Sequence, residues 1–366
     1  MRKLTRKIII IANFLVAVLL LLSYTAPFIN PAKILLPAFL GLAYPYLLLA
    51  NFIFFIYFTI RLRRELLISL AAILIGWGHL MNFIPMNFAA RNEQHDTEQK
   101  EEFRVMSYNV RTFDQFNWSN EEDYIEGIYQ LIADESPDIL CIQEFYTVNR
   151  PGMRESDVRR SLSDHPHFSI YYSLRNQTGG DFGIATFSKY PIIKTSRIPF
   201  DNSLNHAVYT DINLGKDTIR VFNIHLQSIR FVERNYSFID TLSLKYSNKQ
   251  LAEFRDIGMR LRDAFERRAE QSNIIYNYIQ ESPYPVIVVG DFNDTPVSYA
   301  YRKIQKGLFD AFRESGRGFG NTYAGDLPSY RIDFILYSKP LESVKFTRLK
   351  SKYSDHYPIS ASFQWP

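Results

Sequence analysis

The stretch Val286-Ile287-Val288-Val289-Gly290-Asp291-Phe292-Asn293-Asp294 determines how the rest of the chain is interpreted. Its β-branched residues predict a short buried strand, and the glycine marks the end of that strand. Asp291 and Asn293 follow two positions apart, so both side chains can project from one side of an extended strand end. Polar groups just beyond a rigid strand are a common arrangement at functional sites. Taken alone, the stretch is equally typical of a turn in which both residues only cap the backbone.

The charge of the chain is divided unevenly. Residues 1–91 hold nine Lys or Arg and one acid, whereas residues 92–366 hold 33 basic and 37 acidic residues. The formal net charge of +4 therefore comes from the N-terminal part. A net-acidic domain lacks the broad basic field of nonspecific nucleic-acid binders, although a local basic groove is compatible with it. The single cysteine, Cys141, cannot form an intrachain disulfide and is interpreted as a buried small hydrophobe.

Residues 1–88 contain three long uncharged runs, which predict a membrane anchor with three transmembrane helices at about 8–24, 37–60 and 66–84. The first run could instead be a signal peptide, because four basic residues precede it. Basic residues are concentrated at the N-terminus and at 61–64, so the positive-inside rule places both in the cytoplasm. We therefore expect an integral membrane protein of the bacterial inner membrane, with its C-terminal domain periplasmic or extracellular.

Residues 89–102 are polar and predict a short linker to a domain at 103–366. Helical spacing is expected over 121–134 and 251–278. About nine short strands are expected at 103–108, 138–142, 168–172, 183–188, 207–213, 218–224, 286–289, 333–337 and 359–363. Many strands with few helices predict an α+β fold of two packed mixed β-sheets flanked by helices, rather than one doubly wound parallel sheet.

Polar residues recur at the ends of these apolar strands. They are Asn109, Glu144, His225, Asp291, Asn293, Asp333, Asp355 and His356. Each has a simple structural explanation on its own: Glu144 as a surface acid, His225 as a satisfied buried histidine, and Asp355 with His356 as a turn signal. Together they supply carboxylate and amide oxygens, which suit Mg²⁺ or Mn²⁺ better than Zn²⁺.

The motifs YNV, IQE, NIHL, GDFN, RIDFIL and SDH, with GGDFGIATFSKYPI between them, resemble the endonuclease/exonuclease/phosphatase superfamily in content and order. The resemblance covers roughly residues 103–365. It implies a deoxyribonuclease I-like four-layer sandwich, preceded here by the three transmembrane helices. It also implies a membrane-tethered, Mg²⁺- or Mn²⁺-dependent phosphoesterase that hydrolyses a phosphodiester by in-line attack of water.

The resemblance also implies roles for the matched residues. It assigns the metal to Glu144, Asn109 and Asp355. It assigns catalysis to Asp291, Asn293, His356, Asp333 and His225. It assigns substrate binding to Asn109, His225 and Asn293. Arg111 stands where some nuclease members carry an acid, so a second metal ligand is not implied there.

The resemblance does not select a substrate, because the superfamily includes nucleases, inositol-phosphate phosphatases and sphingomyelinase-like lipid phosphodiesterases. The alternatives are a nuclease acting on extracytoplasmic DNA or RNA, a lipid phosphodiesterase, and a catalytically inactive phosphate-binding scaffold. The lipid bilayer is the expected partner, and tethering would favour substrates resident in it. Residues 229–268 are interpreted as a lid or as an ordinary solvated helix. The sequence identifies no protein partner.

Overall fold

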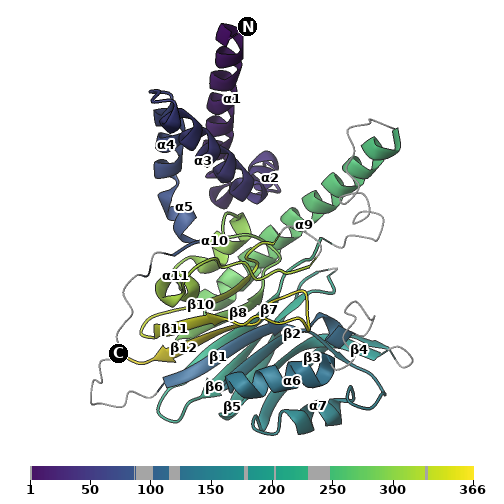
Figure 1. Cartoon of the computed structure of the whole chain (residues 1–366). Helices are drawn as coiled ribbons and strands as arrows, with labels where there is room; N and C mark the ends of the chain where they lie inside the picture. The colour runs from purple at the N-terminus through teal and green to yellow at the C-terminus, as the bar shows by residue number, and fades with distance from the viewer. Residues whose placement is uncertain are drawn as a thin grey trace.

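The computed structural model describes residues 2–85, 87, 102–114, 124–176, 180–201, 203–229, 248–325 and 329–366. Two parts differ in secondary structure: an N-terminal module of helices (residues 2–85) and a sheet domain (residues 102–366) (Figure 1). The linker expected at 89–102 lies outside the described residues except for Glu102, and so do residues 230–247 of the expected lid.

The described part of the sheet domain contains two six-stranded mixed sheets. The first has the order β11 (Glu342–Arg348), β12 (Ile359–Gln364), β1 (Glu102–Asn109), β2 (Ile139–Thr147), β4 (Gly180–Ser188), β3 (His167–Asn176). The second has the order β5 (Ile192–Ile198), β6 (His206–Asn213), β7 (Thr218–His225), β8 (Val286–Asp291), β10 (Asp333–Tyr337), β9 (Phe309–Asp310). β1 pairs with β2, and β7 with β8, in parallel; the other neighbours are antiparallel.

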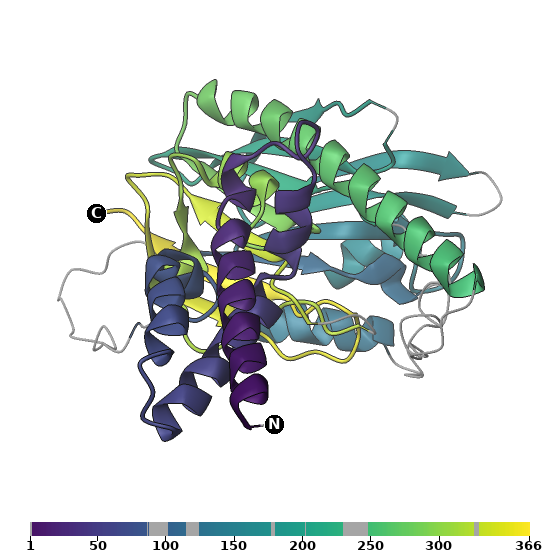
Figure 2. The same ribbon diagram turned by 90° about the horizontal axis from the view of Figure 1, so that it is seen from above.

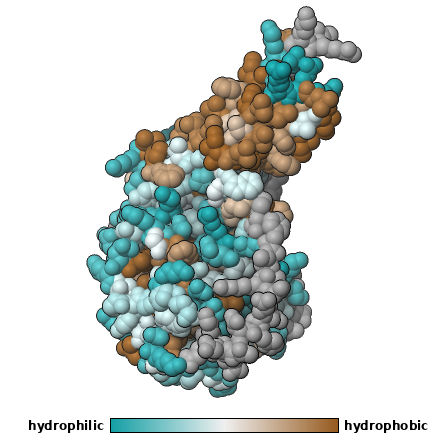
Figure 3. Space-filling model, turned by 90° about the vertical axis from the view of Figure 1, so that its left-hand side faces the viewer, coloured by the Kyte–Doolittle hydropathy of each residue, from teal (hydrophilic) through white to brown (hydrophobic). Residues whose placement is uncertain are grey.

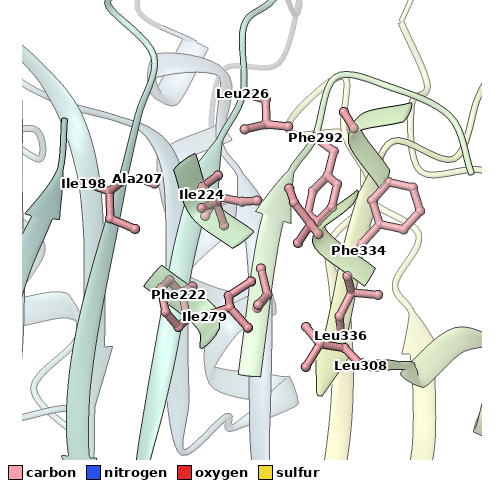
Figure 4. Packing of buried hydrophobic residues seen from close by; sticks show 14 of the residues in the cluster. Ile198, Ala207, Phe222, Ile224, Leu226, Ile279, Phe292, Leu308, Phe334 and Leu336 are labelled. Atoms are coloured by element: carbon pink, nitrogen blue, oxygen red, sulfur yellow. The ribbon is translucent and has the colours of Figure 1, made fainter. Parts of the chain in front are cut away.

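Alternating apolar residues create a core on both faces of each sheet. In β8, Ile287 and Val289 point between the sheets, whereas Val288 points to the opposite face. That outer face is covered by α9 (Asn248–Gln280) and α10 (Tyr299–Gln305), and Figure 4 shows part of the cluster formed there. The outer face of the first sheet packs against α6 (Tyr124–Glu135) and α7 (Glu155–Ser161). The predicted two-sheet α+β architecture with helices on both outer faces is therefore confirmed.

The nine expected strands are all present, but three strands were not expected from the sequence. The missed strands are β5, β9 and β11, and each lies at the edge of its sheet. The two expected helices correspond to α6 and α9. The described part of the sheet domain also contains two short elements, η2 (Arg111–Asp114) and α11 (Ala311–Ser315).

The prediction of three transmembrane helices is wrong. The described residues of the module contain one helix that is long and apolar enough to cross a membrane, over Leu4–Phe28; it covers most of α1 (Arg2–Ser23) and η1 (Ala26–Phe28). The second expected span is bent by 64° between α2 (Leu36–Leu42) and α3 (Tyr44–Ile60). The third is divided into α4 (Leu66–Ile75) and α5 (Trp77–Met81).

Hydropathy alone misses these breaks. Pro45 occupies the first turn of α3, where its lack of an N–H is tolerated but where it cannot continue α2. Gly76 ends α4 at a position where helix continuation is unfavourable by about 1 kcal/mol relative to alanine. The uncharged runs are therefore real, but the helices within them are shorter than the runs.

The N-terminal module has an apolar exterior and polar side chains inside. Most of the large exposed hydrophobic residues of the described chain lie in it, and Figure 3 shows the apolar surface gathered over the module and the more hydrophilic surface over the sheet domain. Its buried interior includes Asn13, Asn51 and Ser69. The Ser69 hydroxyl donates to Asn13 Oδ1 at 2.5 Å, and Asn51 Nδ2 donates to the Leu47 carbonyl at 2.8 Å.

The module packs directly on the sheet domain. Figures 1 and 2 show it lying above α10 and beside α9. Phe39 of α2 meets Phe265 of α9 edge to face, with ring centroids 5.5 Å apart. At the end of the module, the Asn82 carbonyl accepts a hydrogen bond from Arg331 at 2.7 Å. The two parts therefore share both apolar and polar contacts.

Candidate functional site

The expected site residues converge because of the strand topology. β1 and β2 are parallel neighbours in one sheet, so their carboxyl ends bring Asn109 and Glu144 together. β7 and β8 are parallel neighbours in the other sheet, where His225 is in register with Asp291. β10 runs antiparallel to β8 and begins at Asp333, which faces Asp291. The packed sheets thus place all these strand ends at one edge.

Asp291 connects the two sheets at this edge. Its Oδ2 accepts a hydrogen bond from Asn109 Nδ2 at 3.0 Å, and the same amide nitrogen lies 3.4 Å from Glu144 Oε1. Burial raises the pKa of Asp291 to about 7; the charge of His356 opposes this increase, and the carboxylate of Asp333 adds to it. A carboxyl group with such a pKa can exchange protons near neutral pH.

Two of the site residues adopt the left-handed backbone conformation. Glu144 has φ = 52° beside an irregularity in the pairing of β2 with β4, between Ile142 and Phe145. Such bulges re-aim side chains near active sites. Asn293 also has φ = 52°; its N–H donates to Asp291 Oδ1 at 2.7 Å and its Nδ2 to the Leu226 carbonyl at 3.0 Å. Strain of this kind, held in place by surrounding bonds, is a feature of functional sites.

His356 is held by a carboxylate. Its Nδ1 lies 2.9 Å from Asp333 Oδ2, and its Nε2 lies 3.8 Å from Asp291 Oδ2. Burial opposes the charged ring, but the carboxylates of Asp333 and Asp291 outweigh that effect and raise the pKa of His356 well above its usual value. The Nε2–H group of the His356 imidazolium therefore points toward Asp291. The ring of Tyr323 packs against it edge to face at 5.4 Å.

His225 has the opposite electrostatic character. It is 3% exposed, and its Nε2 lies 3.7 Å from Asp291 Oδ2 and 3.8 Å from Glu144 Oε1. Burial, together with the charges of the nearby His206 and His356, lowers the pKa of His225 to about 3. Neither ring nitrogen has a hydrogen-bond partner among the described residues. A neutral imidazole with an unused polar atom therefore faces the same small space.

Asp355 completes the set of expected residues. Its neighbour Ser354 donates a hydrogen bond to the Asn109 carbonyl at 2.7 Å, which fixes the loop against the end of β1. Asp355 Oδ2 lies 3.4 Å from Arg111 Nε. Burial raises the pKa of Glu144, and the charge of Asp355 raises it further, so the two carboxylates interact unfavourably.

Two groups of side chains in the site could hold a cation. Ligand atoms of Asp291, Asp333 and His356 lie within 4.8 Å of one another. A protonated His356 cannot coordinate a metal, however, and its Nδ1 is already bonded to Asp333. The oxygen atoms of Glu144, Asn109 and Asp355 fit a hard divalent ion better, because such an ion would relieve the repulsion between the two carboxylates.

Two buried arginines that support the site were not identified from the sequence. Arg268 of α9 is 1% exposed; its Nε lies 3.1 Å from Asp294 Oδ2 and its Nη1 donates to the Asn293 carbonyl. Arg331, two residues before Asp333 in the chain, is also 1% exposed. It forms an ion pair with Asp310 at 2.5 Å. Arg331 begins the RIDFIL motif and could have been noticed, whereas nothing local distinguishes Arg268 from the other arginines of a charged helix.

Comparisons with known proteins identify a family and agree with the fold. A model described as the Endonuclease/Exonuclease/phosphatase family matches residues 106–356, and one described as a domain of unknown function matches residues 6–83. No curated protein matches the chain. A Bacteroides vulgatus endonuclease/exonuclease/phosphatase structure is 18% identical with a TM-score of 0.53, covering 73% of this chain and 100% of that chain. The human Nocturnin catalytic domain with bound sulfate is 18% identical with a TM-score of 0.51, covering 73% and 97%.

Proposed function

Because the chain belongs to the endonuclease/exonuclease/phosphatase family, we propose that it is a divalent-metal-dependent phosphoesterase that hydrolyses a phosphodiester by in-line attack of water. One observation carries the proposal. Asn109 of one sheet donates a hydrogen bond to Asp291 of the other and lies within 3.4 Å of Glu144, and His356 faces the same Asp291 carboxylate. This arrangement combines oxygen ligands, a carboxyl group that titrates near neutrality and a cationic donor in one site.

The metal would be held by Glu144, Asn109 and Asp355, and Mg²⁺ or Mn²⁺ suits these donors. When bound, such an ion polarises a phosphoryl oxygen and stabilises the departing oxygen. Arg111, 3.4 Å from Asp355, adds positive charge on the same side. The chain's own residues supply the remaining functions.

Asp291 orients the attacking water and accepts its proton. Asn293 donates to the same carboxylate from Nδ2 at 3.1 Å, so it fixes the base and lies next to the nucleophile. As the water oxygen bonds to phosphorus, the bond from phosphorus to the leaving alcohol oxygen breaks, and that oxygen takes up a proton from solvent. The His356 imidazolium, positioned by Asp333, balances the charge on the phosphoryl oxygens. His225 and Asn109 provide neutral contacts to the phosphate.

We also infer that the N-terminal module is a membrane tether. Its apolar exterior and its buried Asn13, Asn51 and Ser69 follow the arrangement expected of helices packed in lipid. Arg6 pairs with Glu65 at 2.8 Å, which places the N-terminal end of α1 beside the basic loop between α3 and α4. Both therefore lie at one end of the module, and the positive-inside rule favours the cytoplasmic face for that end.

The test is hydrolysis of bis-p-nitrophenyl phosphate by the detergent-solubilised full chain with Mg²⁺, with and without a chelator. We expect activity that the chelator abolishes. Replacing Glu144 or His356 with alanine should lower turnover by about 10²-fold or more while the protein stays folded, comparable to losing one electrostatic stabiliser. Near-normal rates in both variants, or full activity in the presence of chelator, would refute the proposal.

A further inference from the structure

The two loops that carry the site also carry contacts to the N-terminal module. Val297 is the fourth residue after Asn293, and it is buried in one cluster with Ala17, Leu20 and Ala26 of the module. Tyr330 comes three residues before Asp333. Its hydroxyl donates to the Leu42 carbonyl at 3.2 Å, and its ring meets Tyr46 edge to face at 6.5 Å.

Chain geometry limits how far the site can lie from the module. Four residues span at most about 14 Å when fully extended. Asn293 therefore lies within about 14 Å of Val297. Val297 itself lies against the module, because its carbonyl oxygen would be 2.3 Å from a Cβ atom placed on Gly41. The polar layer on each side of a bilayer is roughly 5–8 Å thick. The site thus lies within about two such layers of the surface on which the module packs.

The side of the sheet domain nearest the module also presents basic residues. The Arg302 guanidinium of α10 lies 4.1 Å from the ring centroid of Phe28, which is 60% exposed at the sheet-domain end of the module. Lys303 and Lys306 follow on the same helix and the turn after it, with their ammonium groups over Tyr276 at 4.2 and 5.5 Å. These cations contrast with the net-acidic domain that carries them, and their position suits anionic lipid head groups.

We propose that the docked module aims the active site at the bilayer that holds the module, and that the substrate is the phosphoester head group of a lipid in that same bilayer. This inference rests on the proposed function and on the membrane tether. Contacts through Val297 and Tyr330 fix both catalytic loops relative to the lipid surface.

The test uses the full chain reconstituted with Mg²⁺ in vesicles of phosphatidylethanolamine and phosphatidylglycerol, with protein-free vesicles of isotope-labelled lipid added. Mass spectrometry of both lipid pools should show hydrolysis in the vesicles that hold the protein, with the labelled pool intact. Equal hydrolysis of both pools, cleavage of added double-stranded DNA in place of lipid, or no lipid hydrolysis would overturn the inference. Bis-p-nitrophenyl phosphate added to the same preparation separates the two proposals: its turnover without lipid hydrolysis refutes the lipid substrate alone.

A variant of Gly41 tests the role of the docked module. A side chain there would meet the Val297 carbonyl oxygen at 2.3 Å and Ala26 Cβ at 2.6 Å, so Gly41→Leu should wedge the module away from the loop. We expect the ratio of lipid turnover to bis-p-nitrophenyl phosphate turnover to fall about tenfold or more, since an error of 1 Å in placement can cost up to about 10²-fold. Gly78→Ala is the matched control, because nothing lies within 4 Å of its Cβ position.

The milder variant Tyr330→Phe removes the bond to Leu42 without adding volume. Its ratio should fall in the same direction by a smaller factor, even if Gly41→Leu fails to fold. An unchanged ratio in Tyr330→Phe and in every folded Gly41 variant would show that the docking does not aim the site.

Discussion

Replacing Asp333 with asparagine tests the electrostatic interpretation of the site. Asp333 Oδ2 lies 2.9 Å from His356 Nδ1, and both residues are buried. A hydrogen bond to a charged group contributes about 1.5–3 kcal/mol. At about 1.4 kcal/mol per factor of ten, Asp333→Asn should lower kcat about 10- to 150-fold with a smaller change in KM. The near-isosteric amide leaves the packing unchanged, so unfolding should remain cooperative.

The pH profile of this variant distinguishes charge from packing. The pKa of His356 is raised in the folded protein, so the imidazolium is present below that pKa and is lost as pH rises through it. Removing the Asp333 carboxylate should move the alkaline limb of the Mg²⁺-dependent rate with bis-p-nitrophenyl phosphate to lower pH. Asp217→Asn, in the exposed turn after β6, is the matched control. A variant with the wild-type rate and the wild-type alkaline limb would refute this reasoning.

Three further predictions concern the metal, the pH dependence of stability and the backbone. Glu144→Gln should raise the Mg²⁺ concentration needed for half-maximal activity. In the native chain, the affinity for Mg²⁺ should weaken as pH falls, because burial raises the pKa of Glu144 and protons then compete with the ion. A Mg²⁺ affinity that does not change with pH would contradict this. Burial lowers the pKa of His206 to about 4, below its usual value of about 6.5, so its contribution to stability is present above pH 6.5 and is lost as pH falls toward 4. His206→Phe should therefore flatten the stability loss between pH 7.5 and pH 5 by about 2 kcal/mol in urea unfolding; an unchanged slope would count against a neutral buried ring. Gly290→Ala should lower the free energy of unfolding by about 3 kcal/mol or more, because φ is 135° and the new Cβ would lie 1.9 Å from the Ile224 carbonyl oxygen. Gly258→Ala in α9 is the control: nothing lies within 4 Å of its Cβ position, so it should leave the free energy of unfolding unchanged or raise it by up to about 1 kcal/mol.

The convergence of the candidate site residues could be predicted from the sequence because most of them follow strongly apolar strands. Asn109, His225 and Asp291 each end a strand in the middle of a sheet, and Glu144 lies at the irregularity within β2; burial of these strands on both faces produces clear apolar runs. The missed strands β5, β9 and β11 are edge strands, and their sequences are mixed because one side faces solvent or a turn. Pattern recognition is therefore reliable for the elements that carry the chemistry and weak for the elements at the margin.

The features that could not be predicted depend on contacts distant in sequence. Arg268 reaches the Asn293 loop from a helix more than 20 residues earlier, and its sequence context matches that of any solvated helix. Glu144 has a left-handed backbone conformation where β2 has one more residue than the segment of β4 that pairs with it. A single sequence does not reveal such an irregularity. Helix breaks near Pro45 and at Gly76 were visible as residue types, but uniform hydropathy across them favoured continuous spans.

The candidate site lies at the junction of the two sheets, so its residues belong to both of them. Asn109 and Glu144 move with one sheet, whereas Asp291, His225 and Asp333 move with the other. If the proposed function holds, a bound phosphate that contacts groups of both sheets would link them and oppose displacement of one sheet relative to the other. The proposed catalysis and the relative position of the two sheets would then depend on the same contacts.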